Sequence, residues 1–154
     1  GTYQLPENQL DRFLMRVRLG YPTPEQEARV LEERPANSPL HSLAPVLSRQ
    51  ELLALQERAD AVSIARPLLS YVIMLAARTR SDARLLHGLA PRGSLALAQA
   101  SRATALVAGR DYVTPDDIVS NVLPVCAHRM VARAASTDTG AVLEDILRSI
   151  PSPA

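Results

Sequence analysis

"GLAPRGSLALAQASRATALVAGRDYVTPDDI", residues 88–118, is the stretch that decides the expected fold. Pro91 begins a run of leucines and alanines that ends at Gly109. A proline at the start and a glycine just past the end are typical of an α-helix, here 91–108. The "TPDD" at 114–117 supplies a threonine cap, a proline at the first helical position and an acidic third residue. The sequence therefore predicts two consecutive helices that are joined by a short turn.

Helical signals continue on both sides of this stretch. The "SRQE" at 48–51 has the form of a capping box, and apolar residues follow it at helical spacing. From Pro67, "PLLSYVIMLAARTR" is apolar around so much of its circumference that we expect a central, buried helix. We expect Pro124 to break the helix that "TPDD" begins, a short helix to run through His128 to Ala135, and a last helix to include 142–150.

The first 34 residues have a different pattern. "LPENQLDRFL" predicts a short helix, and "FLMRVRLGYP", bounded by Gly20 and Pro22, has the pattern of one strand. Thr23 can then cap a helix over 24–34. A lone strand needs a partner, and nothing downstream offers a comparable strand run. The partners would therefore have to lie upstream of residue 1 or in another chain.

These patterns divide the chain into three segments. Residues 1–34 are interpreted as the end of an α/β core, with about one strand and one or two helices. Residues 35–47, rich in proline and serine, are interpreted as an ordered connector. Residues 48–154 should form a bundle of four to six helices, so the expected fold class is mainly α. Because the chain begins without methionine in the middle of a patterned stretch, we expect a piece of a longer protein.

Composition excludes several kinds of function. Seventeen basic residues nearly balance sixteen acidic ones, which argues against a general nucleic-acid or membrane surface. All seventeen are arginine, and without lysine the chain has no Walker A loop of its own. Cys126 is the only cysteine, so no intrachain disulfide forms, and a cytoplasmic protein is expected. There is no Cys/His spacing for a metal site and no apolar run long enough to cross a bilayer.

Few residues stand out as candidates for chemistry. Arg92 lies at a helix start, where a cation is mildly unfavourable without a nearby anion. Arg12 has the ordinary interpretation of a surface arginine, and Cys126 that of a small core residue. His128 and Arg129 could form a polar patch, although a hydrogen-bonded structural role is the simpler interpretation. No Ser, His and Asp set suggests catalysis.

A resemblance adds to this picture. The runs "GTY-LPE-QLDRFL", "LGYP", "APR-SL", "GRDYVTPDDI" and "HR", in this order, resemble the C-terminal part of the MoxR family of AAA+ ATPases. The resemblance covers nearly the whole chain. It implies the last strand of an α/β nucleotide-binding core followed by the complete helical lid. Where the family commonly has "GASPRASL", this chain has "GLAPRGSL", so Leu89 and Gly93 depart from the pattern.

The resemblance also implies site residues and partners. It assigns Arg12 as the arginine finger, presented to ATP in the neighbouring subunit, and Arg92 as sensor 2, which acts within its own subunit. Tyr21 and Pro22 would line the adenine pocket. The longer protein would use ATP and Mg²⁺ in a ring, expected to be a hexamer. It would mature partner complexes like a chaperone, often with a von Willebrand factor type A domain protein.

Two other functions stay open at this point. One is a helical protein-interaction module whose arginines bind an acidic partner and which has no nucleotide role. The other is a nucleic-acid-binding helical domain, which the near-zero net charge disfavours.

Overall fold

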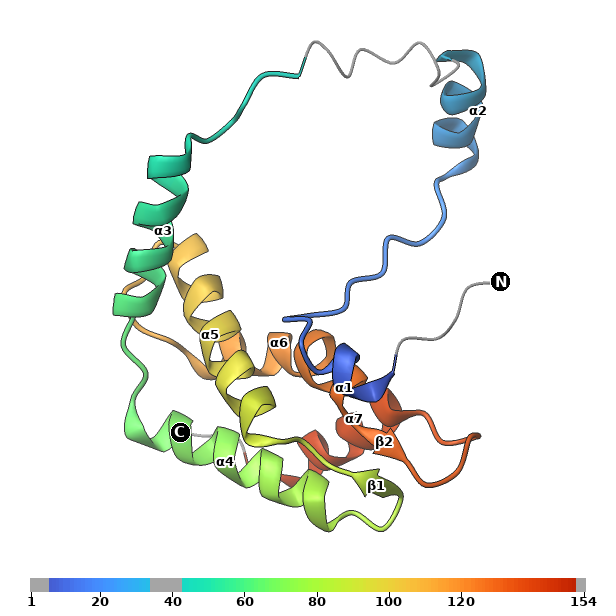
Figure 1. Cartoon of the computed structure of the whole chain (residues 1–154), viewed down its shortest axis with the longest axis vertical. Helices are drawn as coiled ribbons and strands as arrows, with labels where there is room; N and C mark the ends of the chain where they lie inside the picture. The colour runs from blue at the N-terminus through green and yellow to red at the C-terminus, as the bar shows by residue number, and fades with distance from the viewer. Residues whose placement is uncertain (1–5, 34–42, 152–154) are drawn as a thin grey trace.

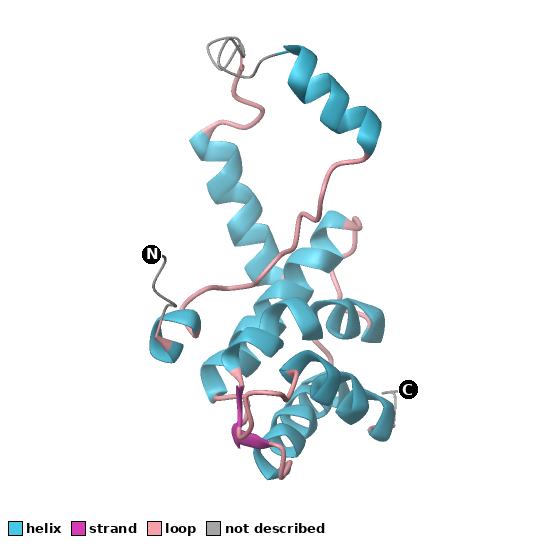
Figure 2. Cartoon of the chain, turned by 90° about the vertical axis from the view of Figure 1, so that its right-hand side faces the viewer, coloured by secondary structure: helices cyan, strands magenta, loops and turns pink. Residues whose placement is uncertain are grey.

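The computed structural model describes residues 6–33 and 43–151, and these are mainly helical (Figure 1). In chain order the elements are α1 (Glu7–Leu10), α2 (Pro24–Glu33), α3 (Arg49–Ala61), α4 (Arg66–Ser81), β1 (Leu85–His87), α5 (Pro91–Val107), α6 (Pro115–Cys126), a 3-10 helix (Ala127–Arg129), β2 (Val131–Ala132) and α7 (Thr139–Ser149). Helices α4 to α7 form a bundle, α3 packs against α5 at the edge of this bundle, and α2 lies apart from it (Figure 2).

The core lies where α4, α5, α6 and α7 meet. Leu75 of α4, Leu97 of α5, Ile118 of α6 and Leu143 of α7 have no solvent-exposed surface. The expectation that the helix after Pro67 is buried is confirmed, because α4 contributes six buried residues to this core. The bundle around α5 is what holds the first turn of that helix in place.

Local capping chemistry sets several helix starts as the sequence predicts. The Ser48 amide donates to Glu51 Oε2 over 2.7 Å, and the Glu51 amide donates to Ser48 Oγ over 3.2 Å, which completes the capping box of α3. These hydrogen bonds lower the pKa of Glu51. At α6 the amide of Thr114 donates to Asp117 Oδ2 over 2.7 Å. The helix predicted over 91–108 is α5, which ends at Val107.

The strand expected between residues 14 and 19 takes no sheet partner among the described residues. Residues 15–23 are extended and exposed, and the Arg16 amide donates to the carbonyl of Pro124 over 2.8 Å. The sheet in the described part of the chain instead joins β1 and β2 in antiparallel pairing, with Leu85 opposite Ala132. These two strands are short and pair with each other, so neither is a partner for residues 14–19.

Two further expectations for the C-terminal third are corrected. The helix expected through His128 to Ala135 is absent: a 3-10 turn ends at Arg129 and the chain becomes extended. The reason is long-range pairing, since β2 joins β1 and the Arg133 amide donates to the Arg84 carbonyl over 3.0 Å. Pro124 also does not end α6, which continues to Cys126. Proline removes one helical hydrogen bond here, and the full burial of Val125 and Cys126 holds the last turn in place despite that loss.

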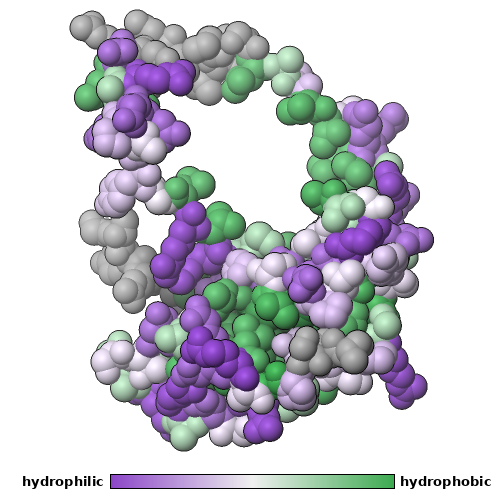
Figure 3. Space-filling view, turned by 180° about the vertical axis from the view of Figure 1, so that it is seen from behind, coloured by the Kyte–Doolittle hydropathy of each residue, from purple (hydrophilic) through white to green (hydrophobic). Residues whose placement is uncertain are grey.

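The connector expected at 35–47 lies partly outside the described residues. Within the described part, Leu43 and Val46 are largely exposed, and no residue of α3 is buried. Figure 3 shows the apolar side chains along this side of the molecule. In the described ranges 6–33 and 43–151, no helix is both long and apolar enough to span a bilayer.

Candidate functional site

The turn before α5 is fastened to the end of α4. A Cβ on Gly88 would lie 2.5 Å from the backbone of Thr79 and Arg80, so only glycine allows this approach. The Leu89 amide donates to Thr79 Oγ1 over 2.9 Å, and Arg80 Nε donates to the Leu89 carbonyl over 2.8 Å. These contacts fix the chain three residues before Arg92, the second residue of α5.

The first turn of α5 is packed tightly against Leu89, which lies two positions before the helix. Leu89 is fully buried, and a Cβ on Gly93 would lie 2.3 Å from Leu89 Cδ1 and 3.3 Å from Arg129 Cδ. The space that a side chain at position 93 would need is already filled by Leu89. Two of the three departures from the "GASPRASL" run, Leu89 and Gly93, therefore form one exchange of volume between positions that lie side by side.

The structure brings Arg12 and Arg92 together. Both line a hollow of about 180 Å³, whose other lining residues are Asp11, Leu14, Leu95, Ala96, Gln99 and Arg129. Arg12 is exposed, and 61% of the Arg92 side chain is exposed. Arg92 Nη1 lies 3.7 Å from Asp11 Oδ2, which supplies the anion that a cation at a helix start needs. At this exposure the pair itself contributes little to stability.

Arg129 is buried beneath the same hollow. Only 2% of its side chain is exposed, and its Nη1 donates to Asp11 Oδ1 over 2.9 Å and to the Asp11 carbonyl. Its Nη2 donates to the carbonyls of Phe13 and Leu14 over 2.6 and 3.3 Å. Its Nε donates to the Val125 carbonyl over 2.8 Å. The buried arginine thus joins α6 to the residues around Arg12.

His128 supports the same junction. Its Nε2 lies 3.0 Å from the Phe13 carbonyl, whereas its Nδ1 is buried and has no hydrogen-bond partner. This arrangement fits the neutral ring with the proton on Nε2. Burial is the main cause of a lowered pKa for His128, and the nearby cations Arg129 and Arg16 lower it further.

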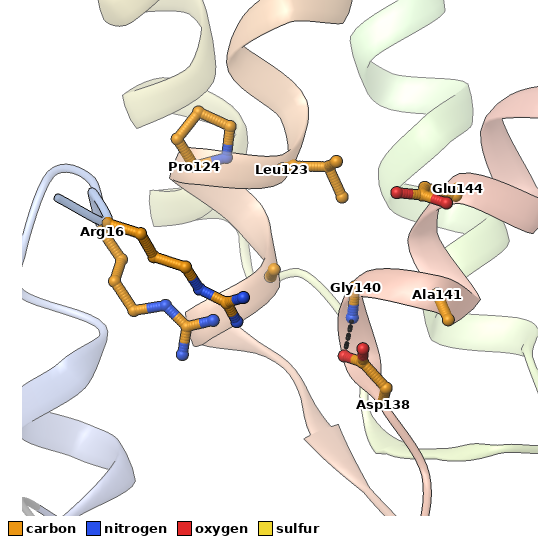
Figure 4. Close-up of a pocket in the computed structure, with 9 residues that line it drawn as sticks. Arg16, Leu123, Pro124, Asp138, Gly140, Ala141 and Glu144 are labelled. Carbon is orange, nitrogen blue, oxygen red and sulfur yellow. Dashed lines mark hydrogen bonds between the residues drawn. The ribbon is translucent and has the colours of Figure 1, made fainter. Parts of the chain in front are cut away.

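A second hollow, of about 400 Å³, lies between the extended N-terminal segment and the start of α7 (Figure 4). Arg16 lies on one side and the carboxylates of Asp138 and Glu144 lie on the other, and Arg18 also lines this hollow (Figure 4). Asp138 also caps α7 by accepting from the Gly140 amide over 2.8 Å. Because two arginines and two carboxylates line this second hollow, their charges balance, and it is a poorer anion site than the hollow that contains Arg12 and Arg92.

Other ionisable groups in the bundle are structural. Arg110 donates to both Asp117 oxygens over 2.7 Å, and this hydrogen bonding lowers the pKa of Asp117 to about 2. Burial raises the pKa of the Cys126 thiol to about 12. Within residues 6–33 and 43–151 no group of three or more His, Cys, Asp or Glu side chains could hold a metal ion.

Comparisons with known proteins agree on one family. Residues 77–150 match the family described as the AAA lid domain. The chain is 38% identical to YeaC of Bacillus subtilis and 34% identical to the chaperone MoxR1 of Mycobacterium tuberculosis, in each case over 99% of its own length. A crystal structure of a candidate ATPase from Cytophaga hutchinsonii has a TM-score of 0.86 and 29% identity over 98% of this chain. The chain fits the C-terminal part of a MoxR-family AAA+ protein.

The match covers only part of each MoxR-family relative. The chain spans 48% of YeaC, 44% of MoxR1 and 50% of the solved structure, so it spans about half the length of these relatives. The mainly helical bundle with a small core remnant is confirmed by this likeness. One of these relatives is named as a chaperone, and the solved structure is named as that of a candidate ATPase.

The two adenine-side candidates lie apart from Arg12 and Arg92. The Tyr21 ring is fully exposed, and Pro22 is exposed beside it on the extended segment before α2. Neither residue lines the hollow that contains Arg12 and Arg92.

Sequence reasoning missed Asp11 and Arg129 as members of the site. Asp11 contacts both Arg92 and Arg129, and Arg129 contacts residues more than 110 positions earlier in the chain. The signal that could have found Arg129 is its place in "VCAHRM", where an arginine is surrounded by residues suited to a core. The "HR" of the family pattern pointed to the same residue.

Proposed function

We propose that this chain supplies arginines to ATP hydrolysis in a ring-forming, chaperone-like MoxR-family AAA+ protein, and that Arg12 and Arg92 act on the same nucleotide. One observation carries the proposal: both side chains line a single hollow of about 180 Å³. Their guanidinium groups are exposed enough to meet a ligand from outside the chain. Guanidinium groups suit phosphate oxygens, because they donate in pairs and stay charged at neutral pH.

The chemistry explains why two arginines would be needed there. Transfer of a γ-phosphoryl group places negative charge on its equatorial oxygens, and arginine fingers that stabilise this charge are worth about 10³–10⁵ in rate. Asp11 pairs with Arg92 across 3.7 Å in an exposed, weak contact. A phosphate group carries more charge than this carboxylate and would compete with it for Arg92.

The shared hollow changes one assignment that the resemblance implies. The family pattern gives Arg12 to the neighbour's nucleotide and Arg92 to its own. Two side chains that line one small hollow are better placed to serve one phosphate group. We therefore propose that both arginines reach the nucleotide of the adjacent subunit. A closed head-to-tail ring, with a hexamer as the proposed size, would complete every site in this way.

The cofactor itself would be held mainly by residues outside this chain. The hollow is lined by arginines and therefore fits phosphate oxygens. Mg²⁺ prefers carboxylate and water ligands, and Asp11 is the one carboxylate among the residues that line this hollow. Without a Walker A lysine, residues 1–154 alone are expected not to hydrolyse ATP. Tyr21 and Pro22 remain our proposal for the adenine side, and a von Willebrand factor type A domain protein our proposal for the partner.

Subunit mixing in the full-length protein tests the proposal. Arg12→Ala or Arg92→Ala subunits, each with an intact P-loop, are mixed with increasing amounts of P-loop-dead subunits that retain both arginines. We expect each arginine variant alone to lose ATP turnover, and the dead subunits to restore it in both cases. Arg148→Ala, which removes an exposed arginine of α7, is the matched control and should hydrolyse normally.

The outcomes separate the alternatives. Restoration for Arg12→Ala but not for Arg92→Ala would return Arg92 to its own subunit's nucleotide. Normal turnover by both variants would refute a nucleotide role for these arginines and favour a plain helical interaction module.

A further inference from the structure

We infer that Arg129 is a positioning residue for Arg12, because it holds the backbone on both sides of that residue. The inference rests on the proposed function, since it concerns how Arg12 is presented to a neighbouring nucleotide. Arg129 does not face the hollow with a free group. It acts through the loop that carries Arg12.

The hydrogen bonds of Arg129 are concentrated on this loop. A guanidinium group has five N–H donors, and those of Arg129 reach five acceptors. Four of the acceptors belong to residues 11–14: the side chain and carbonyl of Asp11 and the carbonyls of Phe13 and Leu14. They lie immediately before and after Arg12, so its Cα is fixed from both directions.

The fifth donor anchors the same arginine to the bundle. Arg129 Nε donates to the Val125 carbonyl over 2.8 Å at the end of α6. The stem of the side chain passes beside the first turn of α5, where a Cβ on Gly93 would lie 3.3 Å from Arg129 Cδ. One side chain therefore contacts the loop of Arg12 and the helical turn that carries Arg92.

Other contacts show how little else holds the loop in place. Within the loop, the Arg12 and Phe13 amides donate to carbonyls of the preceding turn, at Gln9 and Leu10, over 3.1 Å. These local bonds shape the turn but do not attach it to the bundle. In the described part of the chain, the other polar contacts between this region and the bundle are the His128 contact to the Phe13 carbonyl, the Arg16 amide on the Pro124 carbonyl, and the exposed Arg92–Asp11 pair.

A lysine at position 129 could not make the same set of hydrogen bonds. Its ammonium group is a single point with three donors, whereas the acceptors lie around a planar fork that reaches α6 and residues 11–14 at once. Arg129→Lys keeps the buried positive charge next to Asp11 and removes the fork geometry. The substitution therefore separates positioning from charge balance.

The test uses the mixing assay on the full-length protein. Acceptor subunits carry Arg12→Ala with an intact P-loop, and donor subunits are P-loop-dead with Arg12 intact. We expect donors that also carry Arg129→Lys to restore turnover about 100-fold less well, because misplacing a catalytic group by about 1 Å costs that much. Donors with Arg148→Ala should restore it fully. ATP affinity of the acceptors should not change, which places the loss in kcat.

Each result decides between specific statements. If donors without a second substitution fail to restore turnover, the proposed function fails. If they succeed and the Arg129→Lys donors succeed equally well, the positioning role is refuted while the proposed function stands.

A second measurement does not depend on ring assembly. In the full-length Arg129→Lys protein, we expect the Arg16 amide to exchange its hydrogen at least about tenfold faster, because local opening governs exchange. That amide donates to Pro124 across the junction and reports whether the loop stays docked. Amides in the core of α4 serve as the internal control. Unchanged exchange at Arg16 would show that Arg129 does not hold the loop.

Discussion

Replacement of Gly93 by alanine tests the packing at the start of α5. The new Cβ would lie 2.3 Å from Leu89 Cδ1 and 2.9 Å from Leu89 Cγ. Carbon atoms in contact normally lie about 3.5–4.0 Å apart, so something must move by more than an ångström. Leu89 is fully buried and its backbone is fastened to Thr79 and Arg80, which leaves it little room to move.

The magnitude follows from two opposing effects. Overpacking of a tight core costs about 1–3 kcal/mol, and this overlap belongs near the upper end. Alanine in place of glycine in a helix returns at most about 1 kcal/mol. We therefore expect Gly93→Ala to lower the free energy of unfolding by about 2 kcal/mol. Leu89→Ala alone should cost about 2–5 kcal/mol through the cavity it leaves.

The double variant provides the decisive measurement. Leu89→Ala with Gly93→Ala restores the alanine pair of the family run and places the new methyl group in the space that Leu89 vacates. The loss of unfolding free energy in the double variant should be at least about 1 kcal/mol smaller than the sum of the losses in the two single variants, as expected for coupled neighbours. Urea unfolding of the unchanged protein and the three variants measures these losses.

A matched control uses another glycine near a helix start. A Cβ on Gly140 meets only the Asp138 carboxylate, at 3.2 Å, so Gly140→Ala should change stability far less than Gly93→Ala. The exchange of volume between positions 89 and 93 would be refuted if the stability changes of Leu89→Ala and Gly93→Ala add up in the double variant. It would also be refuted if alanine at Gly93 and alanine at Gly140 cost the same stability.

Three further predictions concern the bundle. The pKa of Asp117 falls from 3.8 to about 2 on folding, so the hydrogen bonds that its carboxylate accepts from Arg110 and Thr114 together contribute on the order of 2 kcal/mol above pH 4. This contribution should be lost as pH falls toward 2. Urea unfolding should therefore show that Asp117→Asn has a lower free energy of unfolding than the unchanged protein at pH 7, and that this difference disappears near pH 2. A difference that stays constant with pH would contradict the prediction. Thr79→Val should cost about 1–3 kcal/mol in urea unfolding by leaving the Leu89 amide without an acceptor, whereas Thr79→Ser should not. The Cys126 thiol, whose pKa is raised to about 12, should resist a thiol reagent at pH 8 until urea unfolds the chain, and fast labelling of the native protein would contradict its burial.

The parts of the fold that the sequence predicts are those decided by near neighbours. The capping residues of α3 contact atoms three positions away, and the start and end of α5 follow from a proline and a glycine. Local sequence patterns do not indicate which residues far apart in the chain will pair. The two strands of the β1–β2 sheet have three and two residues, too few for an alternating pattern to be recognised. For this reason the sequence after Arg129 predicts a helix, whereas the structure has an extended chain there.

The candidate site divides in the same way. Arg12 and Arg92 could be named because short motifs surround them, but nothing local shows that they line one hollow. Asp11 and Arg129 gain their roles only by meeting each other across 118 positions. The apolar residues around Arg129 in the sequence indicate burial, but they do not show which distant residues this arginine contacts.

The buried charge of Arg129 makes the loop of Arg12 and the helical bundle one mechanical unit. Undocking residues 11–14 would leave a guanidinium group that is 2% exposed without its carboxylate partner. Hydrogen bonds to a charged group contribute about 1.5–3 kcal/mol each, more than the exposed Arg92–Asp11 pair can contribute. If the lid rotates when its own subunit changes nucleotide state, the loop should therefore move with it. In the ring that we propose, that motion would shift Arg12 in the neighbouring site, and one buried arginine would link hydrolysis in adjacent subunits.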